Sequence, residues 1–117
     1  MNYFKDEEFC RCSPSCSMDD CDGEALAMLD RLREAVGFPL ILNSAYRSPA
    51  YEKKRRRTGM SSHCKGKAFD IRCLDDKLRA LIVFNAPRVG FTRVGIHRRY
   101  VHVDCDVDKL NPCIWLY

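Results

Sequence analysis

Three side chains with metal-binding chemistry lie in two short segments of this 117-residue chain. His63 and Asp70 are seven positions apart in the segment Ser-Ser-His-Cys-Lys-Gly-Lys-Ala-Phe-Asp, and His102 follows about thirty residues later. Two imidazoles and one carboxylate are typical ligands of a catalytic Zn²⁺, which leaves a fourth position open. This set therefore predicts a catalytic zinc site.

Zinc held by three such ligands lowers the pKa of a bound water toward ~7 and polarises a carbonyl oxygen as a Lewis acid. A lone histidine is more often structural than ligating, but the three residues together favour a metal site. Gly66 allows a tight turn after His63, and Ala68 leaves space beside the metal. Such a site could make a hydroxide nucleophile near neutral pH.

Two predicted strands position these ligands. In a strand over 67–73, Asp70 shares one face with Ala68 and can point into a cleft, because side chains alternate between the two faces. In a second strand over 100–105, Val101 and Val103 face the core, and His102 and Asp104 emerge together on the opposite face. One face of this strand packs against the core, and the other carries the side chains that could act on a metal or substrate.

Apolar spacing and turn residues predict the remaining elements. We expect helices over 22–36, 49–57 and 75–85, a strand over 38–45, and a strand over 92–97 that forms a hairpin with 100–105 through Arg98 and Arg99. Residues 111–117 are apolar enough to dock on the core. The predicted fold class is α+β, with a small antiparallel sheet packed with two to three helices in a single domain of residues 1–117. Residues 1–21 are a Cys-rich lead-in segment.

Composition limits the function classes. With 46% hydrophobic residues, one domain can bury a core, and a net charge of +4 is only mildly basic. The acidic start of the chain lacks a signal peptide pattern, so we expect synthesis in the cytoplasm and reduced thiols. No apolar run approaches the ~20 residues of a membrane span, so we expect no membrane insertion. The basic run at residues 53–57 is typical of a solvated helix face, and the alternative is steering of an anionic substrate.

The eight cysteines do not follow a regular zinc pattern. The spacings of two, four and five in the lead-in segment allow a second zinc ion but do not favour one. These lead-in cysteines are Cys10, Cys12, Cys16 and Cys21. Cys64 lies inside the motif without being a predicted ligand, and the remaining cysteines, Cys73, Cys105 and Cys113, are interpreted as small buried hydrophobic residues.

The motif Ser-x-His-x-x-Gly-x-Ala-x-Asp, preceded by Ser-Ala-Tyr-Arg-Ser-Pro at 44–49 and followed by His-Val-Asp at 102–104, resembles the zinc D-alanyl-D-alanine carboxypeptidases of peptidase family M15. That family includes D-Ala-D-Ala dipeptidases and phage endolysins that cut peptidoglycan cross-peptides, and it shares its fold with hedgehog signalling domains. The resemblance runs from Phe4 to the end of the chain. It implies a hedgehog/DD-peptidase-like fold and a peptidase activity.

The resemblance also implies residue roles. His63, Asp70 and His102 match the zinc ligands of the family. Arg47 matches an arginine that holds a substrate carbonyl or carboxylate and stabilises the developing oxyanion, which suits a permanently charged guanidinium. By its sequence alone Arg47 could equally be a surface turn residue. Ser61 could contact the substrate or the zinc-bound water.

The general base departs from the family pattern. Many relatives carry an acidic residue three positions before the last zinc ligand, where this chain has Arg99. Asp104 is the first candidate to replace it, because it lies on the same strand face as His102. Asp104 could instead orient a liganding histidine. His97, on the neighbouring strand, is the second candidate for the base.

Three functions follow from these residues. The first is a zinc peptidase of the D-Ala-D-Ala carboxypeptidase or endopeptidase type, expected to be a monomer that acts on peptidoglycan peptides. It could reach the cell wall by phage-type release or stay inside the cell. The second is a hedgehog-like zinc domain that is weak or inactive in catalysis and binds the cell wall or a protein. The third, a nucleic-acid binder, leaves the metal-ligand set unexplained, so we expect no nucleic-acid partner.

Overall fold

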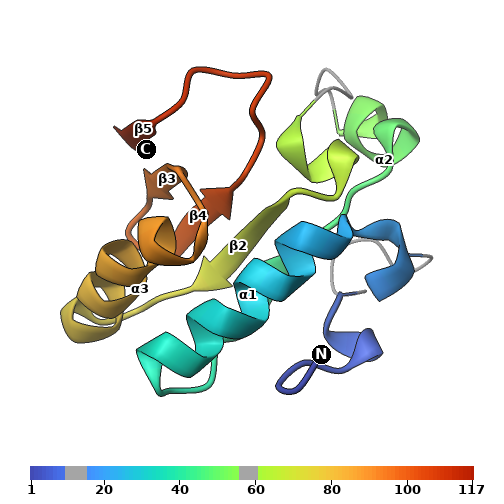
Figure 1. Ribbon diagram of the computed structural model, residues 1–117. Helices are drawn as coiled ribbons and strands as arrows, with labels where there is room; N and C mark the ends of the chain where they lie inside the picture. Colours follow the sequence, from blue (N-terminus) through green and yellow to red (C-terminus); the bar gives the residue numbers. More distant parts are fainter. Residues whose placement is uncertain (10–15, 56–60) are drawn as a thin grey trace.

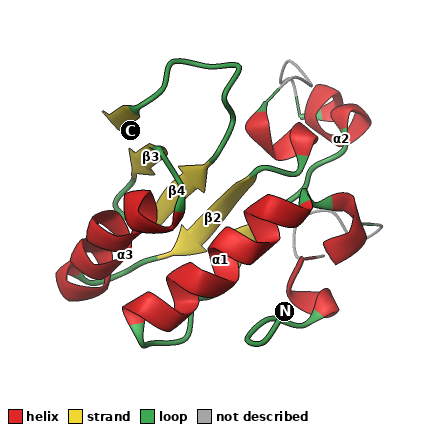
Figure 2. Cartoon of the chain, viewed as in Figure 1, coloured by secondary structure: helices red, strands yellow, loops and turns green. Residues whose placement is uncertain are grey.

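A computed structural model describes residues 1–9, 16–55 and 61–117, and in this part of the chain a five-stranded mixed sheet has the order β1-β2-β4-β3-β5 (Figures 1 and 2). The strands are β1 (Leu42–Ser44), β2 (Ala68–Arg72), β3 (Arg93–Ile96), β4 (Tyr100–Asp104) and β5 (Cys113–Leu116). The helices are α1 (Gly23–Val36), α2 (Pro49–Lys54) and α3 (Asp76–Val89), with short 3-10 turns η1 (Asp6–Phe9), η2 (Met18–Asp20) and η3 (Ser62–Lys65). The predicted α+β class is confirmed.

The two long helices begin at aspartate caps and end at glycines. The Asp22 carboxylate accepts a hydrogen bond from the Ala25 amide at 3.0 Å and starts α1. The corresponding cap of α3 is Asp75. This helix continues past the predicted end at residue 85, because Pro87 falls in the last turn and removes only one hydrogen bond before the left-handed Gly90 ends the helix.

The hydrophobic core lies between the sheet and the helices α1 and α3, which pack together (Figure 1). Its centre is a chain of edge-to-face rings in which Phe69 of β2 contacts both Phe9 and Phe91, with ring centroids 6.3 and 6.1 Å apart. Phe9 in turn contacts Phe4. The lead-in segment therefore contributes two buried aromatic residues to the core, which its lack of periodicity did not predict.

The C-terminal segment differs from the prediction. It forms β5, which pairs with β3 in parallel, so the sheet is mixed where the prediction had an antiparallel sheet. Hydrogen bonds between the backbones of β5 and β3 hold this segment at the edge of the sheet. Burial of its aliphatic side chains contributes little to its attachment. Ile114 and Leu116 are 64% and 78% exposed. The predicted β3–β4 hairpin is present and antiparallel.

Two other elements are shorter than predicted. β1 spans only Leu42–Ser44 of the predicted strand over 38–45, since Pro39 has no amide proton to donate and Phe38 is exposed. The helix predicted over 49–57 is described as α2 up to Lys54, and the predictions for Arg56 and Arg57 lie outside the described residues. No helix in residues 1–9, 16–55 and 61–117 is long and apolar enough to cross a membrane.

Candidate metal centre

Strand register builds the floor of the site. Asp70 of β2 pairs directly with His102 of β4, and His102 pairs on its other side with Gly95 of β3. Ser44 of β1 pairs with Asp70, and Trp115 of β5 pairs with Gly95. These five residues form one row across all the strands of the sheet. Because neighbouring valines and Phe69 face the core, this row lies on the face away from α1 and α3.

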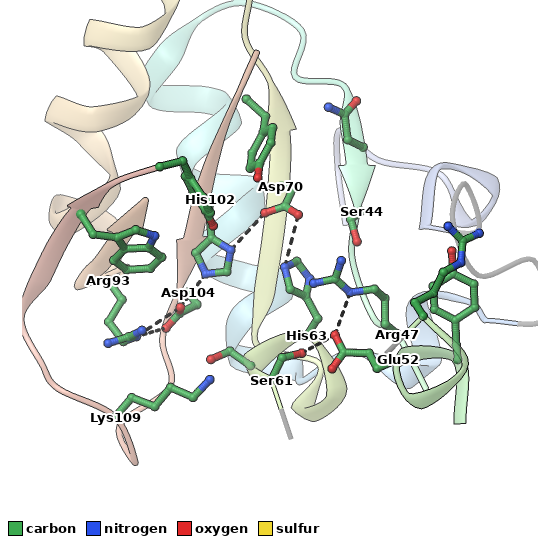
Figure 3. Close-up of a pocket in the computed structure, with 17 residues that line it drawn as sticks. Ser44, Arg47, Glu52, Ser61, His63, Asp70, Arg93, His102, Asp104 and Lys109 are labelled. Atoms are coloured by element: carbon green, nitrogen blue, oxygen red, sulfur yellow. Dashed lines mark hydrogen bonds and ion pairs between the residues drawn. The ribbon is translucent and has the colours of Figure 1, made fainter. Parts of the chain in front are cut away.

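The 3-10 turn η3 adds the third ligand by holding His63 over this row (Figure 3). Asp70 lies between the two imidazoles: its Oδ2 is 3.4 Å from His63 Nε2, and its Oδ1 is 3.0 Å from His102 Nδ1. One ligand atom from each of the three residues lies within 4.8 Å of the others. The structure therefore brings the three predicted ligands together as a group that could hold a metal ion.

Hydrogen bonds behind the histidines fix which ring nitrogen faces the metal position. His63 Nδ1 donates to the Ala45 carbonyl oxygen at 2.7 Å, which leaves Nε2 free to bind a metal. His102 Nε2 donates to Asp104 Oδ2 at 2.6 Å, which leaves Nδ1 on the side of Asp70. Metal-binding histidines almost always have such a partner on the second nitrogen. The donor set therefore fits a zinc ion.

The charges in this group are strongly coupled. Burial alone would raise the pKa of Asp70, but the nearby His63 and His102 hold it well below its usual range. Burial alone would lower the pKa of His102, but its hydrogen bonds to Asp104 and Asp70 raise it. Both shifts favour an imidazolium beside a carboxylate. A divalent metal ion at this position would take the place of the proton on the imidazolium beside Asp70. Metal binding should therefore release protons from the protein.

The loop that carries His63 is fastened to the rest of the domain. Gly66 adopts a φ of +70°, and a Cβ there would lie 2.6 Å from the Asp20 carbonyl oxygen, so only glycine fits. The Asp22 amide donates to the Gly66 carbonyl oxygen at 2.9 Å. On the other side, the Ser62 hydroxyl donates to the buried Asp106 at 2.8 Å. These contacts hold His63 at a defined place over the sheet.

An open cavity of about 720 Å³ surrounds the three ligands. Besides them, its lining residues are Asn43, Ser44, Arg47, Tyr51, Glu52, Arg55, Ser61, Ser62, Arg93, Tyr100, Asp104, Lys109, Trp115 and Tyr117. Its volume lies within the ~300–1,000 Å³ of typical ligand pockets. Several cations and aromatic rings in this wall give it the character of a binding site for an anionic or polar ligand.

The predicted site residues differ in where the structure places them. Arg47, Ser61 and Asp104 line the cavity with the ligands. His97 does not line it. Its ring stacks on Tyr100 with centroids 4.4 Å apart, and its Nδ1 accepts a hydrogen bond from the Arg99 amide, so it lies at the end of the hairpin. The prediction of His97 as a base therefore has no geometric support.

Asp104 is fully buried and bonded on both carboxylate oxygens. Its Oδ2 accepts from His102, and its Oδ1 lies 3.0 Å from Arg93 Nε and accepts from the Asp106 amide at 3.0 Å. Arg93 pairs with Asp104 in the β3–β4 register, which explains the contact. This geometry favours the second of the two roles predicted for Asp104, the orientation of His102.

Sequence reasoning missed several residues of the cavity. Glu52 was included in a helix taken to be solvated, but its side chain is completely buried beside Arg47. A signal was available, because Glu52 is the single acidic residue between the Tyr-Arg-Ser-Pro turn and the basic run. Arg93 and Trp115 come from β3 and β5. No local pattern marks them, since only the strand order brings them to the ligands.

The lead-in cysteines form no second metal group within the described residues, where the cluster of His63, Asp70 and His102 is the one found. Cys10 and Cys12 lie outside the described residues. The described cysteines are free thiols. Burial raises the pKa of Cys21 to about 11, which disfavours the thiolate that a metal would need. Cys73 is buried as predicted, and Cys105 and Cys113 are only half-buried.

An imidazole and a carboxylate on the sheet, with a second imidazole held over them by η3 in an open cavity, form a donor set that suits a metal-dependent hydrolase. The family model described as Peptidase M15 matches residues 2–106. The chain therefore belongs to the peptidase M15 family, and this membership implies a metallopeptidase. The comparison with curated proteins gave no match.

Proposed function

We propose that this chain is a zinc-dependent peptidase that hydrolyses a peptide bond in peptidoglycan stem or cross-link peptides. The observation that carries the proposal is the group of His63, Asp70 and His102 at the floor of an open cavity. When bound there, zinc would polarise the scissile carbonyl and lower the pKa of a coordinated water. Membership of the M15 family supports a peptide bond as the bond that is cut.

Side chains in the wall of the cavity would bind the substrate. Arg47 lines the cavity with its guanidinium anchored through Nε to Glu52 at 3.1 Å, which leaves its other donors for a substrate carbonyl or carboxylate. On the other side, Lys109 and Arg93 add positive charge, and Arg93 lies over the Trp115 ring at 5.0 Å. A peptide with free carboxylates, such as a cell-wall stem peptide, matches this wall in charge.

The test is incubation of zinc-loaded protein with purified peptidoglycan and with acyl-D-Ala-D-Ala peptides, followed by mass spectrometry of the soluble products. We expect new amino termini in the wild type. His63→Ala should lose zinc and release no product, because it removes one of three ligands. The matched control is His97→Ala, which removes an imidazole outside the cavity and should retain zinc.

The position of the cut distinguishes the two kinds of peptidase. Release of a single D-alanine indicates a carboxypeptidase, and a cut within the stem or cross-link indicates an endopeptidase. The alternative function is a hedgehog-like binding module, which the arginine at position 99 favours. Zinc-loaded protein that sediments with peptidoglycan but releases no new amine would support that alternative and contradict the peptidase.

A further inference from the structure

A buried carboxylate at the cavity has one oxygen without a partner. Glu52 of α2 is completely buried, and its Oε2 accepts a hydrogen bond from the Ser61 hydroxyl at 2.6 Å and lies 3.1 Å from Arg47 Nε. Its Oε1 is also buried and has no hydrogen-bond partner. Burial of an unsatisfied carboxylate oxygen is costly and calls for an explanation. A donor brought by the substrate or by water would satisfy it.

The other carboxylates of the cavity are already used. Glu52, Asp70 and Asp104 are the three acidic residues in its lining. Asp70 lies between the two histidines as a metal ligand, and Asp104 is bonded to His102, Arg93 and a backbone amide. Glu52 is therefore the one acidic residue of this lining with a free oxygen. Figure 3 shows it on the His63 side of the cavity.

The surroundings of Glu52 keep it ionised. Burial alone would raise its pKa, but the hydrogen bond from Ser61, the neighbouring Cys64 thiol, the charge of Arg47 and the nearby His63 together lower it. Among the described residues, His63 and Cys64 of η3, Ser61 at its N-cap and Arg47 in the turn before α2 are the groups that act on this carboxylate. At neutral pH the side chain is an anion, which is the state that a proton acceptor needs.

We infer that Glu52 is the general base of the proposed peptidase, in place of the acid that is missing at Arg99. Its Oε1 takes a proton from the attacking water as the water oxygen bonds to the carbonyl carbon. The same oxygen then gives the proton to the amide nitrogen when the carbon–nitrogen bond breaks, so the carboxylate is regenerated and the products are one amine and one acid. The inference rests on the proposed function.

Glu52→Gln tests this inference, because glutamine keeps the size and the hydrogen bond to Ser61 but cannot take the proton. We expect kcat to fall by about 10²- to 10⁴-fold, the range for loss of a general base, with KM within a few fold. The acid limb of the wild-type pH profile should disappear. Glu52→Asp should recover part of kcat. Glu34→Gln, an exposed residue of α1, is the matched control and should behave as wild type.

Two further readouts separate proton transfer from structure. Zinc affinity, from chelator competition, should be close to wild type in Glu52→Gln, because Glu52 is not a ligand. The melting temperature should fall, because the largely buried Arg47 loses its counter-charge, so the kinetics are compared at a temperature at which both proteins are folded. Full activity in this variant would overturn the inference and leave the peptidase intact. A rise in KM with unchanged kcat would also overturn it, since Glu52 would then only anchor Arg47. An inactive, zinc-loaded wild type would overturn the proposed function and the inference with it.

Discussion

Asp104→Asn separates orientation of His102 from proton transfer. The substitution keeps the volume of the side chain but removes the negative charge that faces His102 Nε2 at 2.6 Å and Arg93 Nε at 3.0 Å. Loss of a partner that orients a liganding histidine lowers metal affinity by about 10- to 100-fold. At 1.36 kcal/mol per factor of ten, this corresponds to about 1.4 to 2.7 kcal/mol of zinc binding.

The same substitution should also destabilise the fold. The Arg93 side chain is only 12% exposed, so it would lose its counter-charge in a largely buried place. Removal of one partner of a buried pair costs about 3 to 5 kcal/mol. We expect the lower end of that range, because Arg93 retains its hydrogen bond to the Leu110 carbonyl oxygen.

The assay is chelator competition for zinc together with urea unfolding of the metal-free protein. The control is Asp108→Asn, which makes the same change at a side chain that is 75% exposed and should alter neither quantity. Wild-type zinc affinity in Asp104→Asn would refute the reasoning that Asp104 orients His102. Wild-type affinity combined with lost peptidase activity would instead identify Asp104 as the base.

Three further predictions concern the scaffold. Phe69→Ala should lower the free energy of unfolding by about 3 to 5 kcal/mol in urea titrations, because Phe69 is fully buried among other rings; a loss below 1 kcal/mol would contradict the described core. Gly95→Ala should displace the Trp115 ring, since a Cβ would lie 2.5 Å from it, and should shift the emission of the single tryptophan; unchanged emission would show that the ring lies elsewhere. Burial alone would raise the pKa of Asp106, but Lys65 and Ser62 lower it, so its stabilisation is present above the unfolded pKa of about 3.9 and is lost as the pH falls below it. Urea midpoints between pH 7 and pH 3 should therefore fall less steeply in Asp106→Asn than in the wild type, and equal slopes would contradict this.

Much of the ligand placement could be predicted from local sequence. Strand alternation at Asp70 and His102 needs only a period of two, and their spacing within each strand decides which face they occupy. The aspartate caps and glycine ends of the helices are equally local. These features depend on neighbouring residues, so a single sequence contains enough information.

The surroundings of the ligands depend on contacts between distant segments. Arg93 reaches Asp104, and Trp115 lies over Gly95, because β3 pairs with β4 on one side and with β5 on the other. No periodic pattern in the sequence encodes that strand order. Glu52 was missed for a related reason: a charged residue in a basic helix is usually exposed, and only its ion pair with Arg47 explains its burial.

X-ray absorption at the zinc edge of zinc-loaded protein is the most direct test of the central claim. The account predicts one ion per chain with nitrogen and oxygen neighbours at about 2.0 to 2.2 Å, and loss of this signal in His63→Ala. A sulfur shell at about 2.3 Å would place the ion on the cysteines and contradict the account.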